Sequence, residues 1–227
     1  MQIRFLGHAC VEVAGSKRIL IDPYLTGNPA AAVGPEDLAP DYLLVTHGHG
    51  DHVGDAAAIA RRTGAQVVCM VEIGRWFEQQ GIEALGMNLG GSFDFGDGLR
   101  VKLVPAWHSS QLPDGSYGGE PVGFVFWLDG RCFYHAGDTA LFGDMREVIA
   151  PHKLDWAFLP IGDFYTMGPE DALTAAKWLG AQNYLPIHYN TFDLLKQDGA
   201  EFARRVEAEC PGAHCFAVRP GESIELD

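Results

Sequence analysis

Four side chains that can bind a metal ion lie within six residues near position 50. They are His47, His49, Asp51 and His52, and glycines occupy positions 48 and 50 between them. Imidazole and carboxylate groups are the usual protein ligands of Zn²⁺ and similar divalent ions. Because glycine lacks a side chain and tolerates unusual backbone angles, this segment can curl around an ion. The spacing therefore predicts a metal centre, and such a centre can activate water for hydrolysis.

Four ligands so close together indicate two ions rather than one. His47 and His49 are two residues apart in an extended segment, so their side chains point the same way and suit one ion. Asp51 and His52 lie beyond the bend, where we expect a helix to begin, and they suit a second ion. Because neither pair fills a tetrahedral coordination sphere, we expect further ligands later in the chain.

The segments around the motif predict a strand, a ligand loop and a helix in that order. Residues 42–45 form a short apolar run typical of a buried strand, and residues 56–62 are rich in alanine. The carboxyl ends of strands are where α/β folds collect their sites. Three later strands also end in potential ligands: 99–104 before His108, 132–134 before His135 and Asp138, and 183–187 before His188.

The remaining pattern predicts strands and helices along both halves of the chain, with the site between the halves. Further strands are expected at 2–6, 10–13, 18–21, 66–70, 92–95, 122–128, 156–159, 215–218 and 223–226. Helices are expected near 55–63, 74–80, 142–150, 169–179 and 198–209. Two longer loops, 111–120 and 163–167, are expected to border the site. Periodicity alone thus predicts an α/β fold.

The chain resembles the metallo-β-lactamase superfamily, whose H-x-H-x-D-H signature is intact at residues 47–52. It is more closely similar to bacterial and archaeal metal-dependent hydrolases related to ascorbate-6-phosphate lactonase. The segments that carry this similarity span almost the whole chain: 6–8, 21–23, 46–52, 135–139, 160–163, 167–172 and 188–192. The resemblance implies an αββα sandwich, in which helices flank two mixed β-sheets. A length of 227 residues agrees with a single hydrolase domain over residues 1–227.

The resemblance also implies how the ligands divide between two ions. One ion would be bound by His47, His49 and His108, the other by Asp51, His52 and His188, and Asp138 would bridge them. The imidazole at position 49 favours hydrolysis, because relatives with di-iron oxygen chemistry tend to have a carboxylate there. Nitrogen and oxygen ligands of this kind suit Zn²⁺ or Mn²⁺, and they also accept Fe²⁺.

Three further roles follow from the expected chemistry. Two ions that share a water lower its pKa toward ~7 and supply hydroxide at neutral pH. Asp51 or Asp138 would orient this hydroxide and receive its proton. His8, at the end of the first strand, is a candidate for a substrate contact or a general acid, with a structural role as the alternative. His135 is a candidate to fix a ligand through a hydrogen bond.

We expect a hydrolase that cleaves an ester-type bond, in a lactone or a phosphodiester, of a small anionic substrate. A phosphodiesterase that acts on nucleic acid is one alternative, because related sites cleave nucleic acids. The net charge of −14, from 30 acidic and 16 basic residues, opposes non-specific binding to nucleic acid. A non-catalytic metal-binding scaffold or sensor is the other alternative. The complete ligand set disfavours it, since a structural site needs no second ion or open position.

Composition and cysteine content indicate where the protein works. A hydrophobic fraction of 47% and a charged fraction of 20% are ordinary for a globular protein. The first residues already form a predicted strand, and no apolar run has the length of a bilayer, so we expect no signal peptide and no membrane span. Five cysteines without a paired framework suit reduced thiols in the cytoplasm. The resembling proteins suggest a homo-oligomer.

Overall fold

Seven strands form the first of two β-sheets in the computed structural model, which describes residues 1–226. Their order across the sheet is β14-β1-β2-β3-β4-β5-β6. Their bounds are Gln2–Gly7 (β1), Cys10–Ala14 (β2), Arg18–Ile21 (β3), Tyr42–Val45 (β4), Gln66–Met70 (β5), Ala84–Met87 (β6) and Ser223–Glu225 (β14). The pairs from β14 to β3 are antiparallel, and those from β3 to β6 are parallel. The sheet is therefore mixed.

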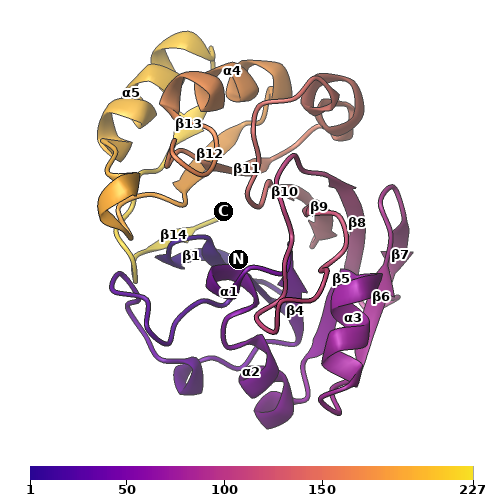
Figure 1. The fold of residues 1–227 in the computed structure, drawn as a ribbon. Coiled ribbons are helices and arrows are strands. Elements are labelled where there is room, and N and C mark those ends of the chain that lie inside the picture. Colours follow the sequence, from indigo (N-terminus) through magenta and orange to yellow (C-terminus); the bar gives the residue numbers. More distant parts are fainter. Residues whose placement is uncertain (227) are drawn as a thin grey trace.

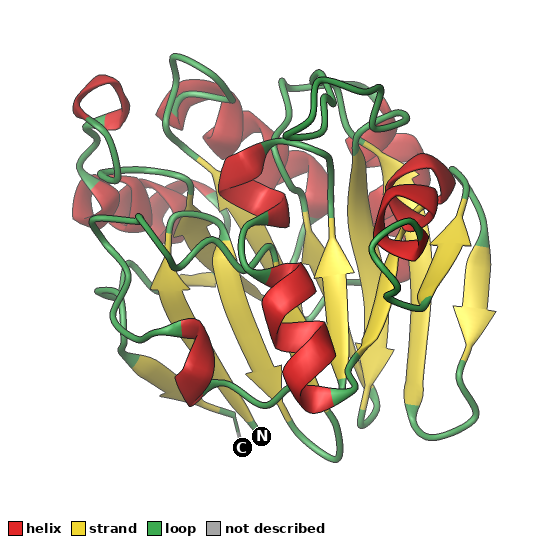
Figure 2. Cartoon of the chain, turned by 60° about the horizontal axis from the view of Figure 1, so that its bottom comes forward, coloured by secondary structure: helices red, strands yellow, loops and turns green. Residues whose placement is uncertain are grey.

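The second sheet has the order β13-β12-β11-β10-β9-β8-β7 and repeats the same division. Its strands are Ser92–Asp94 (β7), Leu99–Pro105 (β8), Val122–Leu128 (β9), Arg131–His135 (β10), Trp156–Pro160 (β11), Asn183–Ile187 (β12) and His214–Cys215 (β13). The pairs from β7 to β10 are antiparallel, and those from β10 to β13 are parallel. The two sheets pack together, and helices flank them as in the expected αββα sandwich (Figures 1 and 2).

Within residues 1–226, five α-helices connect the strands or cover the sheets: Gly50–Val53 (α1), Ala56–Thr63 (α2), Val71–Glu78 (α3), Pro169–Leu179 (α4) and Gly199–Glu209 (α5). Shorter turns are the 3₁₀ helices Pro35–Asp37, Ala150–His152 and Asp193–Leu195 and the π-helix Met145–Ile149. α4 has the predicted bounds. Proline suits its first position, the acidic Glu170 and Asp171 lie beside the positive end of the dipole, and Gly180 ends it in a left-handed conformation.

Two apolar clusters hold these layers together. The larger cluster joins the facing sides of the two sheets, for example Leu44 with Phe126 and Phe158, and extends to α2 and α3. The second lies between the second sheet and the helices α4 and α5. The central parallel strands β4 and β11 are buried along their whole length, which explains their continuous apolar sequence.

Three elements differ from the sequence prediction. The helix expected at 142–150 is a π-helix at Met145–Ile149 followed by a 3₁₀ turn, since Pro151 cannot continue an α-helix and restricts the residue before it. Strand β6 was not predicted. It lies at the edge of the sheet and is only partly buried, so its sequence lacks the apolar pattern of a buried strand. The strand at 215–218 is limited to His214–Cys215.

Among residues 1–226, no helix combines the length and apolar character that a bilayer crossing requires. All five cysteines carry free thiols, and four of them are buried.

Candidate metal centre

The ligand loop has the predicted plan of strand, loop and helix. His47 follows β4 after one residue, His49 is the N-cap of α1, and Asp51 and His52 lie in the helix itself. His47 and His52 are fully buried, whereas the Asp51 side chain keeps 32% of its surface exposed. The loop therefore offers two enclosed imidazoles and one carboxylate that solvent can reach.

The three later ligand candidates join this loop, although they lie far away in the sequence. His108 comes shortly after β8, Asp138 after β10, and His188 directly after β12. Asp138 Oδ2 lies 3.0 Å from His188 Nε2, 3.3 Å from His52 Nε2, 3.6 Å from His108 Nε2 and 4.0 Å from His47 Nε2. One carboxylate oxygen thus lies at the centre of four imidazoles.

The ligand atoms form overlapping groups in which all atoms lie within 4.8 Å of one another. The first group is His47, His49 and His108, the second is His8, Asp51, His52 and His188, and the third is His47, His52 and Asp138. Within the first group, His47 Nε2 and His49 Nδ1 are 3.0 Å apart. The groups overlap at His47 and His52, so the ligand atoms form one continuous cluster.

Unpartnered polar atoms indicate that the residues fit divalent cations. His52 Nε2 and Asp138 Oδ1 are buried, and neither makes a hydrogen bond to another described residue. Leaving a buried polar atom without a partner costs about 1–3 kcal/mol. Cations bound between these nitrogen and oxygen atoms would satisfy them, and the donor set is one that Zn²⁺, Mn²⁺ and Fe²⁺ accept.

Burial and nearby charges shift the pKa values of the central groups. Burial lowers the pKa of His47 far below its ordinary value, and nearby His52 lowers it further. For Asp138, burial favours the neutral form, but the charges of His188 and His52 outweigh it and hold the pKa well below normal. A neutral His47 and an ionised Asp138 are the forms that bind metal ions.

Comparisons with known proteins agree with this geometry. The family model of the Beta-lactamase superfamily domain matches residues 17–189. A UPF0173 metal-dependent hydrolase from Thermus thermophilus is 50% identical over 228 residues and covers 100% of both chains. One from Archaeoglobus fulgidus is 44% identical over 231 residues, again with 100% coverage of both. The chain belongs to the UPF0173 metal-dependent hydrolases of the β-lactamase superfamily.

A solved structure shows the same fold for this UPF0173 hydrolase. Igni18, a novel metallo hydrolase from the archaeon Ignicoccus hospitalis, is 37% identical and superposes with a TM-score of 0.90. The match covers 100% of this chain and 99% of that one. The expected enzyme class and the expected sandwich are both confirmed.

Asp22 is a residue of the hydrolase site that the sequence analysis did not assign. It is fully buried after β3, and its carboxylate accepts hydrogen bonds from Thr46 N at 2.8 Å and Thr46 Oγ1 at 2.6 Å. His52 Nδ1 donates to Asp22 at 2.8 Å, so Nε2 of the same ring faces Asp138. The signal was present, since residues 21–23 carry the family resemblance, but they contain no obvious ligand motif.

His8 lies beside Asp51 in the second group of ligand atoms, but it does not line the cleft. Its side chain is fully buried, with Nε2 3.1 Å from Asp51 Oδ2 and Nδ1 2.9 Å from Thr191 Oγ1. Burial lowers the pKa of His8 to about 4, although the hydrogen bond with Asp51 opposes this shift. His8 is therefore neutral at pH 7, and its role as a substrate contact or general acid stays a prediction.

His135 also differs from its expected role. Its Nε2 donates to Ala9 O at 3.0 Å, and its Nδ1 accepts from Gly137 N at 3.1 Å. The ring therefore holds the turn between β10 and Asp138 and makes no hydrogen bond to a ligand.

An open cleft of about 350 Å³ lies over the ligands of the hydrolase. Its walls include Tyr165 and Phe192, so the loop 163–167 borders the site as expected. The loop 111–120 does not line this cleft.

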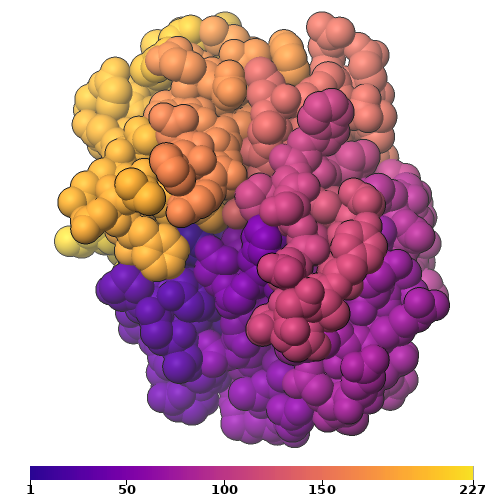
Figure 3. Space-filling model, viewed as in Figure 1, coloured from indigo at the N-terminus to yellow at the C-terminus, as the bar shows by residue number. Residues whose placement is uncertain are grey.

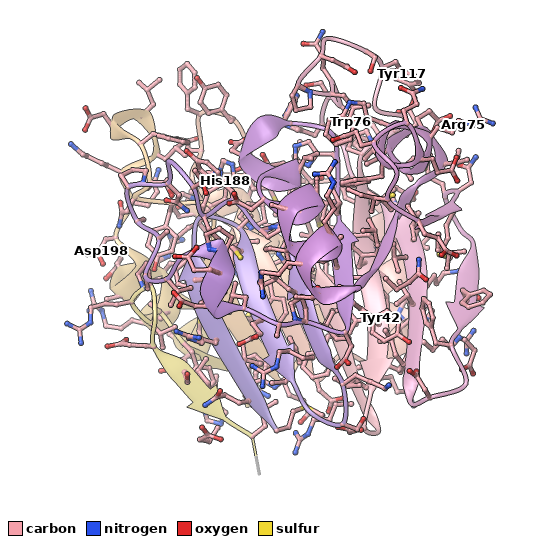
Figure 4. The ribbon with its side chains drawn as sticks, turned by 90° about the horizontal axis from the view of Figure 1, so that it is seen from below. Tyr42, Arg75, Trp76, Tyr117, His188 and Asp198 are labelled. Carbon is pink, nitrogen blue, oxygen red and sulfur yellow. The ribbon has the colours of Figure 1, made fainter. Side chains whose placement is uncertain are left out.

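Figure 4 shows His188 and Tyr42, the first residue of β4, at opposite ends of the sheets. In the space-filling view of Figure 3, segments from the beginning, the middle and the end of the sequence lie against one another near the centre of the visible face.

Proposed function

We propose that this hydrolase cleaves an ester-type bond, in a lactone or a phosphodiester, of a small anionic substrate at a pair of divalent ions. The observation that carries this proposal is the convergence of six nitrogen- and oxygen-bearing side chains around Asp138, beneath an open cleft. We assign the ligands as His47, His49, Asp51, His52, His108, Asp138 and His188. The ions are Zn²⁺ or Mn²⁺, with Fe²⁺ also compatible.

When bound, such ions polarise the scissile group and lower the pKa of a shared water toward ~7. Asp51 is the carboxylate that can accept the proton of this water, because its side chain is 32% exposed and lines the cleft. Burial raises the pKa of Asp51, but the His8 hydrogen bond and the nearby His52 together bring it below the ordinary value. At neutral pH the carboxylate is therefore ionised and ready to orient the water.

Asp138 and His8 act as orienting groups in this proposal. Asp138 is only 3% exposed and lies among four imidazoles, so it would hold the ions and orient the water that they activate. The Asp51 carboxylate can only accept a hydrogen bond, so His8 Nε2 carries the proton and His8 Nδ1 accepts from Thr191. His8 thereby holds the Asp51 side chain in place.

The cleft favours a small molecule over a nucleic acid. Its lining includes no lysine or arginine among the described residues, and Tyr165, Phe192 and Leu195 supply apolar surface. Nucleic-acid binding depends on basic side chains that neutralise phosphates. Negative charge on the substrate is therefore expected at the reacting group, next to the cations.

A substrate panel tests the proposal. Metal-loaded protein is assayed against lactones, carboxylic esters and phosphodiesters, together with Asp51→Asn and the surface control Asp144→Asn. We expect hydrolysis of at least one class and a loss of about 10²–10⁴ in kcat for Asp51→Asn, the usual contribution of a positioned proton acceptor. The control should match the native rate.

Inactivity of the fully loaded protein against every class would contradict the proposal and leave a sensor or scaffold role.

We further infer a cytoplasmic location, supported by free thiols that suit a reducing compartment. A single domain over residues 1–227 is supported by the apolar cluster that both sheets share. The homo-oligomer stays a prediction.

A further inference from the structure

A second hollow lies beside the metal cleft, on the far side of His108. It has a volume of about 540 Å³, and His108 lines both hollows. Six of its eight lining residues are apolar, among them Leu89 and Trp107, and the others are His108 and Glu120. We call this hollow the Trp107 groove. The Trp107 groove and the metal cleft therefore adjoin at His108.

Trp107 forms a fixed wall of the Trp107 groove although its side chain is 66% exposed. Its indole stacks on the buried Phe142, with ring centroids 6.3 Å apart and planes 7° from parallel. Its backbone N–H donates to Thr139 Oγ1 at 2.9 Å, and its carbonyl accepts from Ala140 N at 3.0 Å. The exposed ring is thus tied to the segment that follows Asp138. Large exposed apolar surfaces of this kind commonly mark binding sites.

The charges around the Trp107 groove exclude an anionic occupant. Glu120 is the acidic side chain in its lining, and no lysine or arginine lines it among residues 1–226. The whole protein carries a net charge of −14. A negatively charged group in the groove would meet repulsion without a compensating ion pair, whereas an alkyl or aryl group would lose only contact with water.

We propose that the Trp107 groove binds an apolar alkyl or aryl arm of the substrate while the reacting group lies at the metal centre beyond His108. Trp107 is then a specificity-determining residue. This inference rests on the proposed function, which it extends from the reacting bond to the rest of the substrate. The substrate is amphiphilic, with negative charge near the cations and an apolar arm along Trp107.

Binding of straight-chain hydroxamates, from acetyl to octanoyl, tests this inference on metal-loaded protein by isothermal titration calorimetry. The hydroxamate group chelates the metal ions, and the chain probes the groove. We expect Kd to fall about twofold to fourfold per added methylene, as apolar burial predicts. Trp107→Ala should flatten this dependence and leave the Kd of the acetyl compound within about twofold. A terminal carboxylate on the octanoyl chain should abolish its advantage.

Two further variants test the Trp107 groove even if Trp107→Ala proves unstable. Leu89→Glu adds a second acidic group to the groove and should also flatten the dependence on chain length. Phe93→Ala is the matched control, because Phe93 is a 45% exposed aromatic residue that lines neither hollow. This variant should retain the native dependence.

Two outcomes would overturn the Trp107 groove as a substrate site. These are a Kd that is constant along the series, or equal weakening of all chain lengths by Trp107→Ala. Failure of every hydroxamate to bind, the acetyl compound included, would instead contradict the metal centre of the proposed function. Failure of the proposed function is distinguishable, since it appears as inactivity against the substrate panel while chain-length-dependent binding persists. If the protein hydrolyses a substrate of the panel but Kd is constant along the hydroxamate series, only the proposal for the Trp107 groove is refuted.

Discussion

Asp22 orients two of the buried imidazoles from one position outside the cleft. His52 Nδ1 donates to it directly, and Thr46 Oγ1 donates to it while lying 3.0 Å from His47 Nδ1. Since the Thr46 hydroxyl proton is used on Asp22, His47 Nδ1 carries its own proton and donates to Thr46. Both rings therefore present Nε2 toward Asp138. Carboxylate partners of this kind raise the basicity of metal-binding histidines.

Replacing Asp22 by Asn tests this arrangement. Asp22→Asn retains the size of the side chain but removes its charge, so we expect metal affinity to fall about 10- to 100-fold. The measurement is competitive titration with a chromogenic chelator, together with the far-ultraviolet circular dichroism spectrum to monitor folding.

Asp155→Asn is the matched control for this variant. Asp155 also accepts a backbone hydrogen bond next to a strand, from Cys132 N at 2.7 Å, but it contacts none of the assigned ligands. Equal metal affinity in both variants would refute the orienting role of Asp22.

At the scale of elements, the segments that follow the strands hold the ligands in close backbone contact. His188 follows β12 with a φ of 55°, in the left-handed region, and its N–H donates to His8 O at 2.7 Å. Gly162 follows β11 beside it, and a Cβ at that position would lie 2.3 Å from His188 O and 3.2 Å from His188 Nδ1. Only glycine fits this approach without moving His188.

Gly162→Ala should therefore displace His188 and weaken the site. We expect a loss of about 1–3 kcal/mol in the free energy of unfolding, typical of overpacking, and reduced metal content. Urea denaturation and metal analysis after dialysis measure the two effects.

The control for this element is Gly143→Ala. A Cβ at Gly143 meets no atom within 4 Å, so this variant should match the native protein in both measurements. Full metal content in Gly162→Ala would show that the site tolerates movement of His188.

At the scale of the whole molecule, the proposed metal ions connect the two sheets. The loop after β4 in the first sheet supplies His47, His49, Asp51 and His52. Segments after β8, β10 and β12 in the second sheet supply His108, Asp138 and His188. Bound ions would therefore crosslink the halves of the sandwich and stabilise the folded state.

Removing the ions should lower the thermal stability of the native protein. A ligand present at 100 times its Kd adds about 2.7 kcal/mol of stability. In a protein of this size, such a loss corresponds to a decrease in Tm of about 5–10 °C. Differential scanning calorimetry with and without a chelator measures this change, and added Zn²⁺ or Mn²⁺ should reverse it.

The Tm of Asp138→Asn should fall much less on chelation, because this variant lacks the carboxylate charge that lies among the ligand histidines. An unchanged Tm of the native protein after complete metal removal would contradict the crosslinking role.

The sequence by itself determined the ligand loop and much of the local structure. The bounds of α4 follow from local signals, namely a proline at the start, acidic residues in the first turn and a glycine at the end. The H-x-H-x-D-H motif predicts metal binding because its ligands are close together in the chain. Strand ends likewise indicated His108, Asp138 and His188 as candidates, since each follows an apolar run.

Only the tertiary structure decided which side chains meet and which remain apart. The buried position of His8, the hydrogen bonds of Asp22 and the hydrogen bond from His135 to Ala9 depend on contacts between segments distant in the sequence. The same holds for β14, which returns from the end of the chain to pair with β1. Local patterns specify helices, strands and potential ligands, whereas sheet packing sets the distances between atoms on which binding and proton transfer depend.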